Sequence, residues 1–323
     1  MRLRNGLTWA SIALCMLTAA GPSGAEPYPS RPLRLVVGQP PGGHSDALGR
    51  MVAQRFSELL KQPVVVENRG GASGTIAAEA VARAPADGYT LLFAGSNNLS
   101  LAALTIGDLR YDPLDFAPVG TIGRVSYGLA VNAKLPIASV SDLVRYARAH
   151  PGRLNYGSGG VTSTSRLAFE LLKQSANIEV EHIPLRGSAL AVGEITSGRI
   201  DLLLVDISVL MPHVHNGTLR LIAGARRLRE AADVRTFAEQ GYPEAALEPW
   251  YGIFAPAGTP AEIIATLNQT LAETLRTPEI RQRFDRLDFM PLESTPDELA
   301  ALIRNEMKMF APLVERIKVN PRP

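Results

Sequence analysis

The sequence contains two units in which a short apolar run leads into a glycine-rich corner and then directly into a helix pattern. The first, "VVGQPPGGHSDALGRMVAQRF", spans residues 36–56, and the second, "LNYGSGGVTSTSRLAFELL", spans residues 154–172. The first amides of a helix have no intrahelical partner and lie at its positive end, so such a corner suits an anion. A single corner also occurs in ordinary strand–helix turns. Two corners in separate halves of the chain predict two lobes that face a shared ligand cleft.

The first corner combines conformational freedom with a helix start. Gly42 and Gly43 permit backbone angles that a side chain forbids. We expect Gly43 to be the position where a Cβ would crowd the loop or strain a backbone with positive φ. Ser45 is the expected N-cap of the following helix. The apolar face of this helix is predicted at Leu48, Met51, Val52 and Phe56.

The first 25 residues have the pattern of a secretory signal peptide. Arg2 and Arg4 precede an apolar run from Leu7 to Leu17, and small residues up to Ala25 form a cleavage site. The apolar run is shorter than the about 18 residues of a membrane span, although an uncleaved N-terminal anchor is the alternative. We therefore expect a periplasmic protein after cleavage near Ala25.

Removal of this segment changes the composition in two ways. Cys15 is the chain's one cysteine, so the mature protein is predicted to have no disulfide and no cysteine metal site. Without Arg2 and Arg4 the 33 basic residues become 31, equal to the 31 acidic ones. A neutral chain with 6% aromatic residues does not indicate a nucleic-acid partner.

The body of the chain alternates apolar strand patterns with helical patterns, which is typical of an α/β protein. Helices are expected to begin at residue 45, to cover residues 75–84, and to follow the second corner. Further helix starts are predicted at Ser139, Thr259 and Thr295, each as an N-cap with an acidic residue three positions later. The expected strands are residues 33–37, 64–67, 89–94, 154–157, 180–184, 202–206, 219–223 and 250–255.

A mature chain of roughly 300 residues favours two domains. Two short apolar runs on either side of Arg124 predict one crossing between them, and a second crossing is expected near Ala225. The strand at residues 250–255 is expected to return to the first domain. The predicted division is a discontinuous lobe 1 of residues 26–124 plus 226–323, and a lobe 2 of residues 125–225.

Catalytic and metal-binding motifs match poorly. The glycines around Ser158 lack the G-x-S-x-G spacing, and Thr162 interrupts a dinucleotide fingerprint. His44 near Asp46 could form an acid–base pair, but no nucleophile accompanies it. The segment 213–215, His-Val-His, could bind a metal with a nearby acid, but it is expected to be a surface loop. We predict a protein that is not an enzyme and that has no cofactor and no metal.

Several segments follow one another in a familiar order. They include "YPSRPLRLVVGQPPGGHSDALGR", "VVVENRGGASGTIAAEAVARAPADGYTLLFAGS", "HIPLRGSALAVGEITSGRIDLLLVD" and "WYGIFAPAGTPAEIIATLN". The chain from Tyr28 to Lys318 resembles the extracytoplasmic solute receptors of tripartite tricarboxylate transporters, the Bug-type family. The resemblance implies an α/β, two-lobe periplasmic binding protein of the Venus-flytrap type (type 2-like) with a central ligand cleft. Such receptors close on small carboxylates, amides or related metabolites and deliver them to a membrane permease.

The resemblance also implies a set of cleft residues. One loop, at residues 40–46, matches the loop that holds one end of a dicarboxylate through amides and ordered water. A second loop, at residues 158–166, matches the loop that grips the other end, and the turn at residues 187–189 and the acid at position 206 face the cleft. The implied ligand-binding residues are Pro41, Gly42, Gly43, His44, Ser45, Asp46, Ser96, Asn97, Gly159, Gly160, Val161, Thr162, Ser163, Thr164, Arg166, Gly187, Ser188, Ala189 and Asp206.

Three departures from the family pattern affect the ligand. His44 replaces a small residue, Val161 and Thr162 replace an Asn-Gly pair, and Arg166 replaces a frequent histidine. Arg166 either forms a bidentate pair with a ligand carboxylate or is a solvated residue on the first helical turn. Both interpretations of Arg166 stay open at this point.

The implied partners are a small molecule, expected to be a carboxylate, and the membrane permease subunits of a tripartite transporter. The receptor is expected to be a monomer. A sensory receptor that reports ligand occupancy to a membrane signalling protein would use the same cleft, and a periplasmic enzyme is the more distant alternative. The sequence does not separate transport from sensing.

Overall fold

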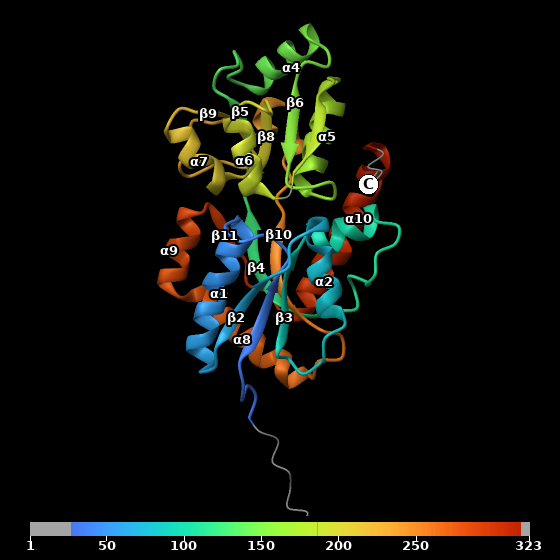
Figure 1. The fold of residues 1–323 in the computed structure, drawn as a ribbon, viewed down its shortest axis with the longest axis vertical. Coiled ribbons are helices and arrows are strands. Elements are labelled where there is room, and N and C mark those ends of the chain that lie inside the picture. Colours follow the sequence, from blue (N-terminus) through green and yellow to red (C-terminus); the bar gives the residue numbers. More distant parts are fainter. Residues whose placement is uncertain (1–26, 186, 318–323) are drawn as a thin grey trace, which may run out of the picture.

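The structure, a computed structural model, describes residues 27–185 and 187–317, which form two lobes that are each built on one sheet (Figure 1). The sheet of lobe 1 has the strand order β11-β4-β10-β3-β1-β2, and that of lobe 2 has the order β7-β6-β8-β5-β9. The predicted signal peptide, with Cys15, lies outside the described residues. No helix in the described part of the chain is long and apolar enough to cross a bilayer.

Lobe 1 contains both ends of the described chain. Its strands are β1 (Leu33–Val37), β2 (Val64–Asn68), β3 (Thr90–Gly95), β4 (Ala117–Val125), β10 (Trp250–Ala255) and β11 (Phe289–Pro291). Its helices are α1 (His44–Leu60), α2 (Thr75–Ala82), α3 (Ala102–Thr105), α8 (Ala261–Arg276), α9 (Pro278–Arg286) and α10 (Pro296–Ile317), with a 3-10 turn at Ala72–Gly74 and a π-helix at Asn97–Leu101.

Lobe 2 contains the middle of the chain. Its strands are β5 (Tyr127–Asn132), β6 (Asn155–Ser158), β7 (Glu181–Pro184), β8 (Leu202–Asp206) and β9 (Leu219–Gly224). Its helices are α4 (Val140–Ala149), α5 (Thr164–Ala176), α6 (Ser188–Thr196) and α7 (Ile207–His215). Two short 3-10 turns, Ala238–Gln240 and Pro243–Ala245, lie in the connection to β10.

All eight expected strands are present within a residue or two of their predicted bounds. The strand β7 is at the edge of its sheet and is half exposed rather than buried. His213 and His215 lie on α7, so the prediction of a loop there is wrong. The apolar residues Ile207, Leu210 and Met211 are buried on this helix, and their helical spacing is the signal from which the helix could have been predicted.

Two of the predicted N-caps are wrong, and two are confirmed. Helix α8 has Pro260 as its N-cap, because the Thr259 hydroxyl donates instead to the Pro256 carbonyl at 2.8 Å. Helix α1 begins one residue before Ser45 and has Gly43 as its N-cap. Thr295 forms a reciprocal capping box with Glu298, and the Ser139 hydroxyl accepts from the Asp142 amide.

The direction of the strands places the same kind of end at the cleft in both lobes. Strands β1, β2 and β3 are mutually parallel, as are β6, β7 and β8. In each lobe the carboxyl ends of these parallel strands face the other lobe, and the helices that follow them begin there (Figure 1). This is the edge at which α/β sheets bind ligands.

The chain passes between the lobes twice. The first passage, at Ser126 between β4 and β5, agrees with the crossing expected near Arg124. After β9, however, Thr236 bridges Gly224, and the Gln240 side chain donates to the Ile222 carbonyl at 2.9 Å, so residues 236–240 pack on β9 of lobe 2. Arg226, closer to β9, also forms an ion pair with Asp288 of lobe 1 at 2.9 Å. We therefore propose that the second crossing lies near Pro249 rather than near Ala225. Lobe 1 is then residues 27–125 plus 250–317, and lobe 2 is residues 126–249.

An apolar cluster joins the two lobes beside the cleft. Helix α10 extends from lobe 1 to α5 of lobe 2, and Phe310 packs with Leu167 and Leu171 (Figure 1). Leu101 of the π-helix and Val314 complete this cluster. The C-terminal helix is therefore a structural element of both lobes.

We expect Phe310→Ala to lower the free energy of unfolding by about 3–5 kcal/mol, because it leaves a cavity in this cluster. Phe310 is 2% exposed, whereas its neighbour Met309 is 52% exposed and provides the matched control. Met309→Ala should change the free energy by less than about 0.5 kcal/mol. Urea denaturation followed by circular dichroism measures both, and equal effects of the two variants would contradict the role of the cluster.

Candidate ligand-binding site

A cavity of about 180 Å³ lies between the lobes at the carboxyl ends of the strands. Lobe 1 contributes the first glycine corner, the π-helix and the start of β10. Lobe 2 contributes the second glycine corner, the start of β5 and the carboxyl end of β8. The lining residues are Gln39, Pro40, Pro41, Gly43, His44, Ser45, Asn97, Tyr127, Gly159, Ser165, Gly187, Ser188, Leu190, Val205, Asp206 and Tyr251. Gln39, Gly159 and Gly187 also line a wider hollow of about 920 Å³ that includes Val161 and Thr162.

Four helix N-termini converge on this cavity. The N-caps of α1, α5, α6 and α7 are Gly43, Ser163, Gly187 and Asp206. Three of these N-caps line the cavity directly, and Ser165 of α5 lines it beside the fourth. Each N-terminus presents amides without intrahelical partners and a partial positive charge of about +0.5. The cavity therefore has the electrostatic character of an anion site, as the two glycine corners predicted.

Asp46 holds the first corner in shape instead of lining the cavity. Its carboxylate accepts hydrogen bonds from the Gly42 amide at 3.0 Å, from Asn68 Nδ2 at 2.9 Å and from Arg50 Nε. Burial favours a raised pKa for Asp46, but these hydrogen bonds outweigh it and hold the pKa below its ordinary value. The Gly42 amide is therefore already used and does not face a ligand.

The special backbone conformation of this corner belongs to Gly42, not to Gly43. Gly42 has φ +86°, a value that favours glycine, whereas Gly43 has φ −84° and is accessible to any residue. An added Cβ at Gly43 would meet only the Pro40 carbonyl oxygen, at 3.7 Å. The expectation of strain at Gly43 is wrong, but the residue does line the cavity.

His44 connects the two lobes at the start of α1. Its Nδ1 lies 2.9 Å from the Ser208 hydroxyl of α7, and its Nε2 is buried without a hydrogen-bond partner among the described residues. Burial lowers the pKa of His44, although the nearby Asp206 opposes this, so the imidazole is neutral near pH 7. Ser45 donates from its hydroxyl to the Tyr251 phenol at 2.9 Å rather than capping the helix.

The second corner approaches lobe 1 closely. Gly160 has φ +144°, and a Cβ there would lie 2.8 Å from the Ser73 hydroxyl of lobe 1. Ser163 caps α5 by accepting from the Arg166 amide, and its hydroxyl donates to the Gly160 carbonyl at 2.8 Å. Ser165 accepts from the Gly159 amide. These bonds fix the corner in a shape that only a glycine at position 160 fits.

Asn97 links the lobes across the cavity. Its side-chain oxygen accepts from both the amide and the hydroxyl of Thr164, each at 2.8 Å. Its amide group also hydrogen-bonds to the Tyr127 phenol, which is buried and has a raised pKa because of burial. The Thr164 amide of α5 is therefore satisfied by lobe 1 itself. The Arg166 and Leu167 amides are satisfied by Ser163, so α5 offers a ligand fewer amides than an uncapped helix would.

Two of the predicted ligand-binding residues form hydrogen bonds within the protein. Ser96 is 1% exposed, and its hydroxyl donates to Glu306 at 2.8 Å and accepts from the Trp250 amide. Arg166 donates from Nη1 to the Val161 carbonyl at 2.9 Å and lines neither hollow of the cleft. Arg166 therefore helps to hold the loop, and a contact of Arg166 with a ligand stays a prediction. The side chain of Ala189 is not among those described.

Several cleft residues were not predicted from the sequence. Tyr127 is the first residue of β5 and Tyr251 is the second residue of β10, the two strands that follow the crossings, and Ser208 is the second residue of α7. The signal that could have indicated the tyrosines is their position, because a strand that follows a crossing must start at the cleft. Gln39 and Leu190 lie next to predicted residues and add to the lining.

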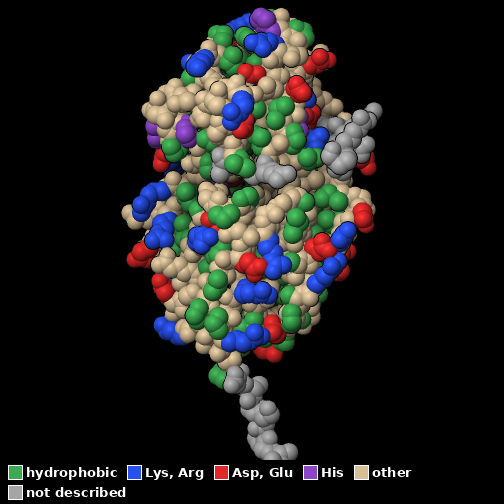
Figure 2. Space-filling view, in the orientation of Figure 1, with side chains coloured by type: hydrophobic (Ala, Val, Ile, Leu, Met, Phe, Trp, Pro, Cys, Tyr) green, Lys and Arg blue, Asp and Glu red, His purple; other side chains and the backbone are tan. Residues whose placement is uncertain are grey.

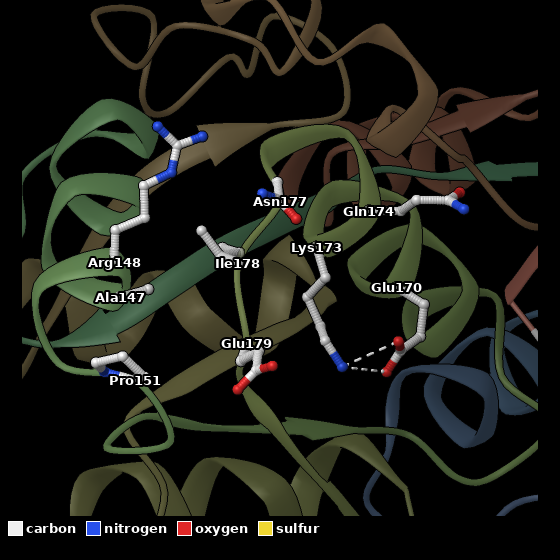
Figure 3. Close-up of a pocket in the computed structure, with 9 residues that line it drawn as sticks. All are labelled: Ala147, Arg148, Pro151, Glu170, Lys173, Gln174, Asn177, Ile178 and Glu179. Atoms are coloured by element: carbon white, nitrogen blue, oxygen red, sulfur yellow. Dashed lines mark hydrogen bonds and ion pairs between the residues drawn. The ribbon is translucent and has the colours of Figure 1, made fainter.

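Two further hollows among the described residues are each lined by one lobe only. A groove between α4 and α5 is lined by residues of lobe 2, among them Lys173, whose ammonium lies 3.0 Å from the Glu170 carboxylate (Figure 3). Basic and acidic side chains are interspersed over the face drawn in Figure 2. Among the described residues, no group of three His, Cys, Asp or Glu side chains is placed to hold a metal ion. The inter-lobe cavity is therefore the candidate site.

The cavity lies between two lobes that are joined by two crossings, and helix N-termini surround it. This arrangement is that of a solute-binding protein. The chain belongs to the tripartite tricarboxylate transporter family of receptors, whose sequence model matches residues 48–319. The resemblance stated from the sequence is confirmed, and so is the predicted α/β fold class. The members of this family are solute-binding receptors.

Individual relatives cover nearly the whole chain. Protein BugT of Bordetella pertussis is 33% identical over 94% of this chain and 95% of its own length. A Rhodopseudomonas palustris protein solved with adipate is 33% identical, has a TM-score of 0.86 and covers 90% of this chain and 98% of its own. MatC of the same organism, solved with malate, is 28% identical, has a TM-score of 0.83 and covers 89% of this chain and 100% of its own.

We expect Gly160→Ala to lower the free energy of unfolding by about 1–3 kcal/mol, because alanine is strained at φ +144° and collides with Ser73. Gly193 lies inside α6 with nothing within 4 Å of its added Cβ, so Gly193→Ala should stabilise the protein by about 0.5–1 kcal/mol. Urea titration measures both. Ser73→Gly should recover part of the loss in Gly160→Ala, and a complete lack of recovery would contradict the contact across the cleft.

The second corner also predicts a dependence on pH. His182 Nε2 lies 2.7 Å from the Ser158 hydroxyl, and burial, with the positive charges of Arg166 and Lys173, lowers the pKa of His182 to about 3. The unfolded chain binds a proton at His182 near pH 6.5, whereas the folded chain does so only near pH 3, so this contribution to stability is present above pH 6.5 and falls as the pH drops toward 3.

We therefore expect the free energy of unfolding to decrease from pH 7.5 to pH 5, and His182→Gln to make this decrease smaller. Glutamine keeps a hydrogen-bonding group for Ser158 but does not titrate. Urea titrations of both proteins at the two pH values measure the difference. An identical pH dependence in the variant would show that His182 protonates alike in the folded and unfolded chains.

Proposed function

We propose that this protein is a periplasmic receptor that captures a small organic carboxylate in its inter-lobe cavity and delivers it to the permease subunits of a tripartite transporter. The observation that carries the proposal is the convergence of four helix N-termini on one small cavity between two lobes. Bare amides at helix starts bind carboxylates without a cationic side chain. The adipate and malate bound by the two Rhodopseudomonas palustris relatives support the same ligand chemistry.

The proposed location and mode of action follow from the same comparison and from the sequence. We propose export by the signal peptide of residues 1–25 with cleavage near Ala25, since the family consists of periplasmic receptors. We also propose that the protein binds its ligand without transforming it and acts as a monomer. The Ser208 hydroxyl beside the His44 imidazole bridges the two lobes, and the solute-binding receptors of this family support binding rather than catalysis.

The ligand-contacting residues are proposed from the cavity lining. The amides that follow Gly43 and Gly187 would receive a carboxylate, and Ser45, Ser165 and Ser188 supply hydroxyls around them. The Gly159 and Gly160 amides already donate to Ser165 and Ser158 and hold the second corner in shape. Asp206 and Asn97 would contact the remainder of the ligand. Thr164, Ser163 and Gly160 support the site by fixing the second corner.

We expect protein purified from rich medium to release one small carboxylate, chemically unchanged, when it is denatured and analysed by mass spectrometry. Gly43→Val should abolish or strongly reduce this release, because its backbone accepts valine without strain while its side chain enters the cavity region. Gly107→Val is the matched control, since Gly107 also has open space around it and does not line the cavity. Circular dichroism confirms that each variant is folded.

Release of the same compound in equal amount from Gly43→Val and from the unmodified protein would place the ligand elsewhere. Release of a compound without a carboxylate would contradict the proposed ligand class. A compound that is converted during incubation with the folded protein would identify an enzyme.

A further inference from the structure

Asp206 places a carboxylate in a cavity that the helix N-termini make suitable for an anion. Among residues 27–185 and 187–317, it is the one Asp, Glu, Lys or Arg that lines the cavity. It is 7% exposed, and its carboxylate has no hydrogen-bond partner among the described residues. It is the N-cap residue of α7, yet its side chain does not cap that helix. A largely buried carboxylate that faces a cavity takes a hydrogen-bond donor from water or from a ligand that replaces the water.

The groups around Asp206 are neutral. Burial lowers the pKa of His44, so its imidazole adds no positive charge near pH 7. Tyr127 pairs with Asp206 in the register of β5 and β8, and burial raises the pKa of Tyr127 well above its ordinary value. Burial also raises the pKa of Tyr251, whose phenol accepts from Ser45 and keeps its own proton for a further bond. None of these side chains compensates the charge of Asp206.

The charges of the helix ends and of Asp206 together define the ligand that fits. Among the described residues, four helix N-termini contribute about +0.5 each, or about +2, and Asp206 contributes −1, which leaves about +1 at the cavity from these groups. A monoanion is complementary to this charge. A dianion would bring its second carboxylate into a cavity of about 180 Å³ that already contains the Asp206 carboxylate.

This inference rests on the receptor function proposed above. We propose that Asp206 makes the receptor bind a monoanionic carboxylate more tightly than the corresponding dicarboxylate. The other end of the preferred ligand donates hydrogen bonds, as an amide or ammonium group does. The ligand carboxylate lies at the starts of α1, α5 and α6, and its donor end lies at Asp206 on the start of α7. The buried Nε2 of His44, which has no partner among the described residues, is a second polar atom for the same ligand.

Matched pairs of small molecules test this selection. Succinate and succinamate, glutarate and glutaramate, and adipate and adipamate differ within each pair only by a carboxylate oxygen that is replaced with an amide nitrogen. Thermal shift and titration calorimetry at pH 7.5 give the affinity ratio of each pair. In at least one pair the monoamide should bind about tenfold or more tightly than the dicarboxylate, because only the amide donates to Asp206.

Asp206→Asn should reduce this ratio by about tenfold or reverse it, mainly through a gain in affinity for the dicarboxylate. Asp233→Asn removes the same charge from an exposed position outside the cavity and should leave the ratio unchanged. Circular dichroism checks the fold, and Asp206→Ser removes the charge if the asparagine variant does not fold.

Equal or tighter binding of the dicarboxylates by the unmodified protein would overturn this selection, while the carboxylate receptor function would stand. An affinity ratio unchanged by both Asp206 variants would also overturn it. Absence of binding by all six probes would reject this ligand class, and the proposed function would then be decided separately by the compound released on denaturation.

Discussion

The parallel direction of three strands in each lobe is the constraint on which the rest of the structure depends. Because the carboxyl ends of β1, β2 and β3 face those of β6, β7 and β8, the helices that follow must begin at the cleft. The positive ends of α1, α5, α6 and α7 therefore meet without any lysine or arginine among the described cavity-lining residues. The anion site is a consequence of topology, and side chains such as Asp206 adjust it.

Besides the apolar contact of α10 with α5, the lobes contact each other through hydrogen bonds and through ion pairs such as that of Arg226 with Asp288 at 2.9 Å. Asn97 binds Thr164, and His44 binds Ser208, and each hydrogen bond contributes about 0.5–1.5 kcal/mol. Such contacts are small enough for the lobes to separate, so a ligand that bridges α1 and α5 can shift the balance toward the closed arrangement. The apolar contact of α10 with α5 lies beside the cleft and keeps one side of the lobes together.

The strands and the two glycine corners could be predicted from the sequence because their signals are local. Apolar runs predicted the bounds of every strand of lobe 2 except β5, for which no bounds were predicted. The corners indicated the helix starts that line the cavity. The N-cap of α1 could not be predicted, because the Ser45 hydroxyl donates a hydrogen bond to Tyr251, which is 206 positions away in the sequence. The hydrogen bonds of Arg166 and Ser96 could not be predicted for a similar reason, because their partners, Val161 and Glu306, depend on the fold around them. The second crossing was placed too early, because residues 236–240 are held to lobe 2 by side-chain hydrogen bonds without a strand pattern.

The central claim is that the two lobes close on a ligand held between them, and a distance across the cleft tests it most directly. Cys15, in the proposed signal peptide, is the chain's one cysteine. In protein expressed without residues 1–25, spin labels at Ile76→Cys in lobe 1 and Glu181→Cys in lobe 2 therefore report a single distance. Both positions are exposed and outside the cavity lining. Pulsed electron paramagnetic resonance should show a shorter and narrower distance distribution after addition of the compound released on denaturation than in its absence. An identical distribution with and without a saturating amount of that compound would contradict closure around the ligand.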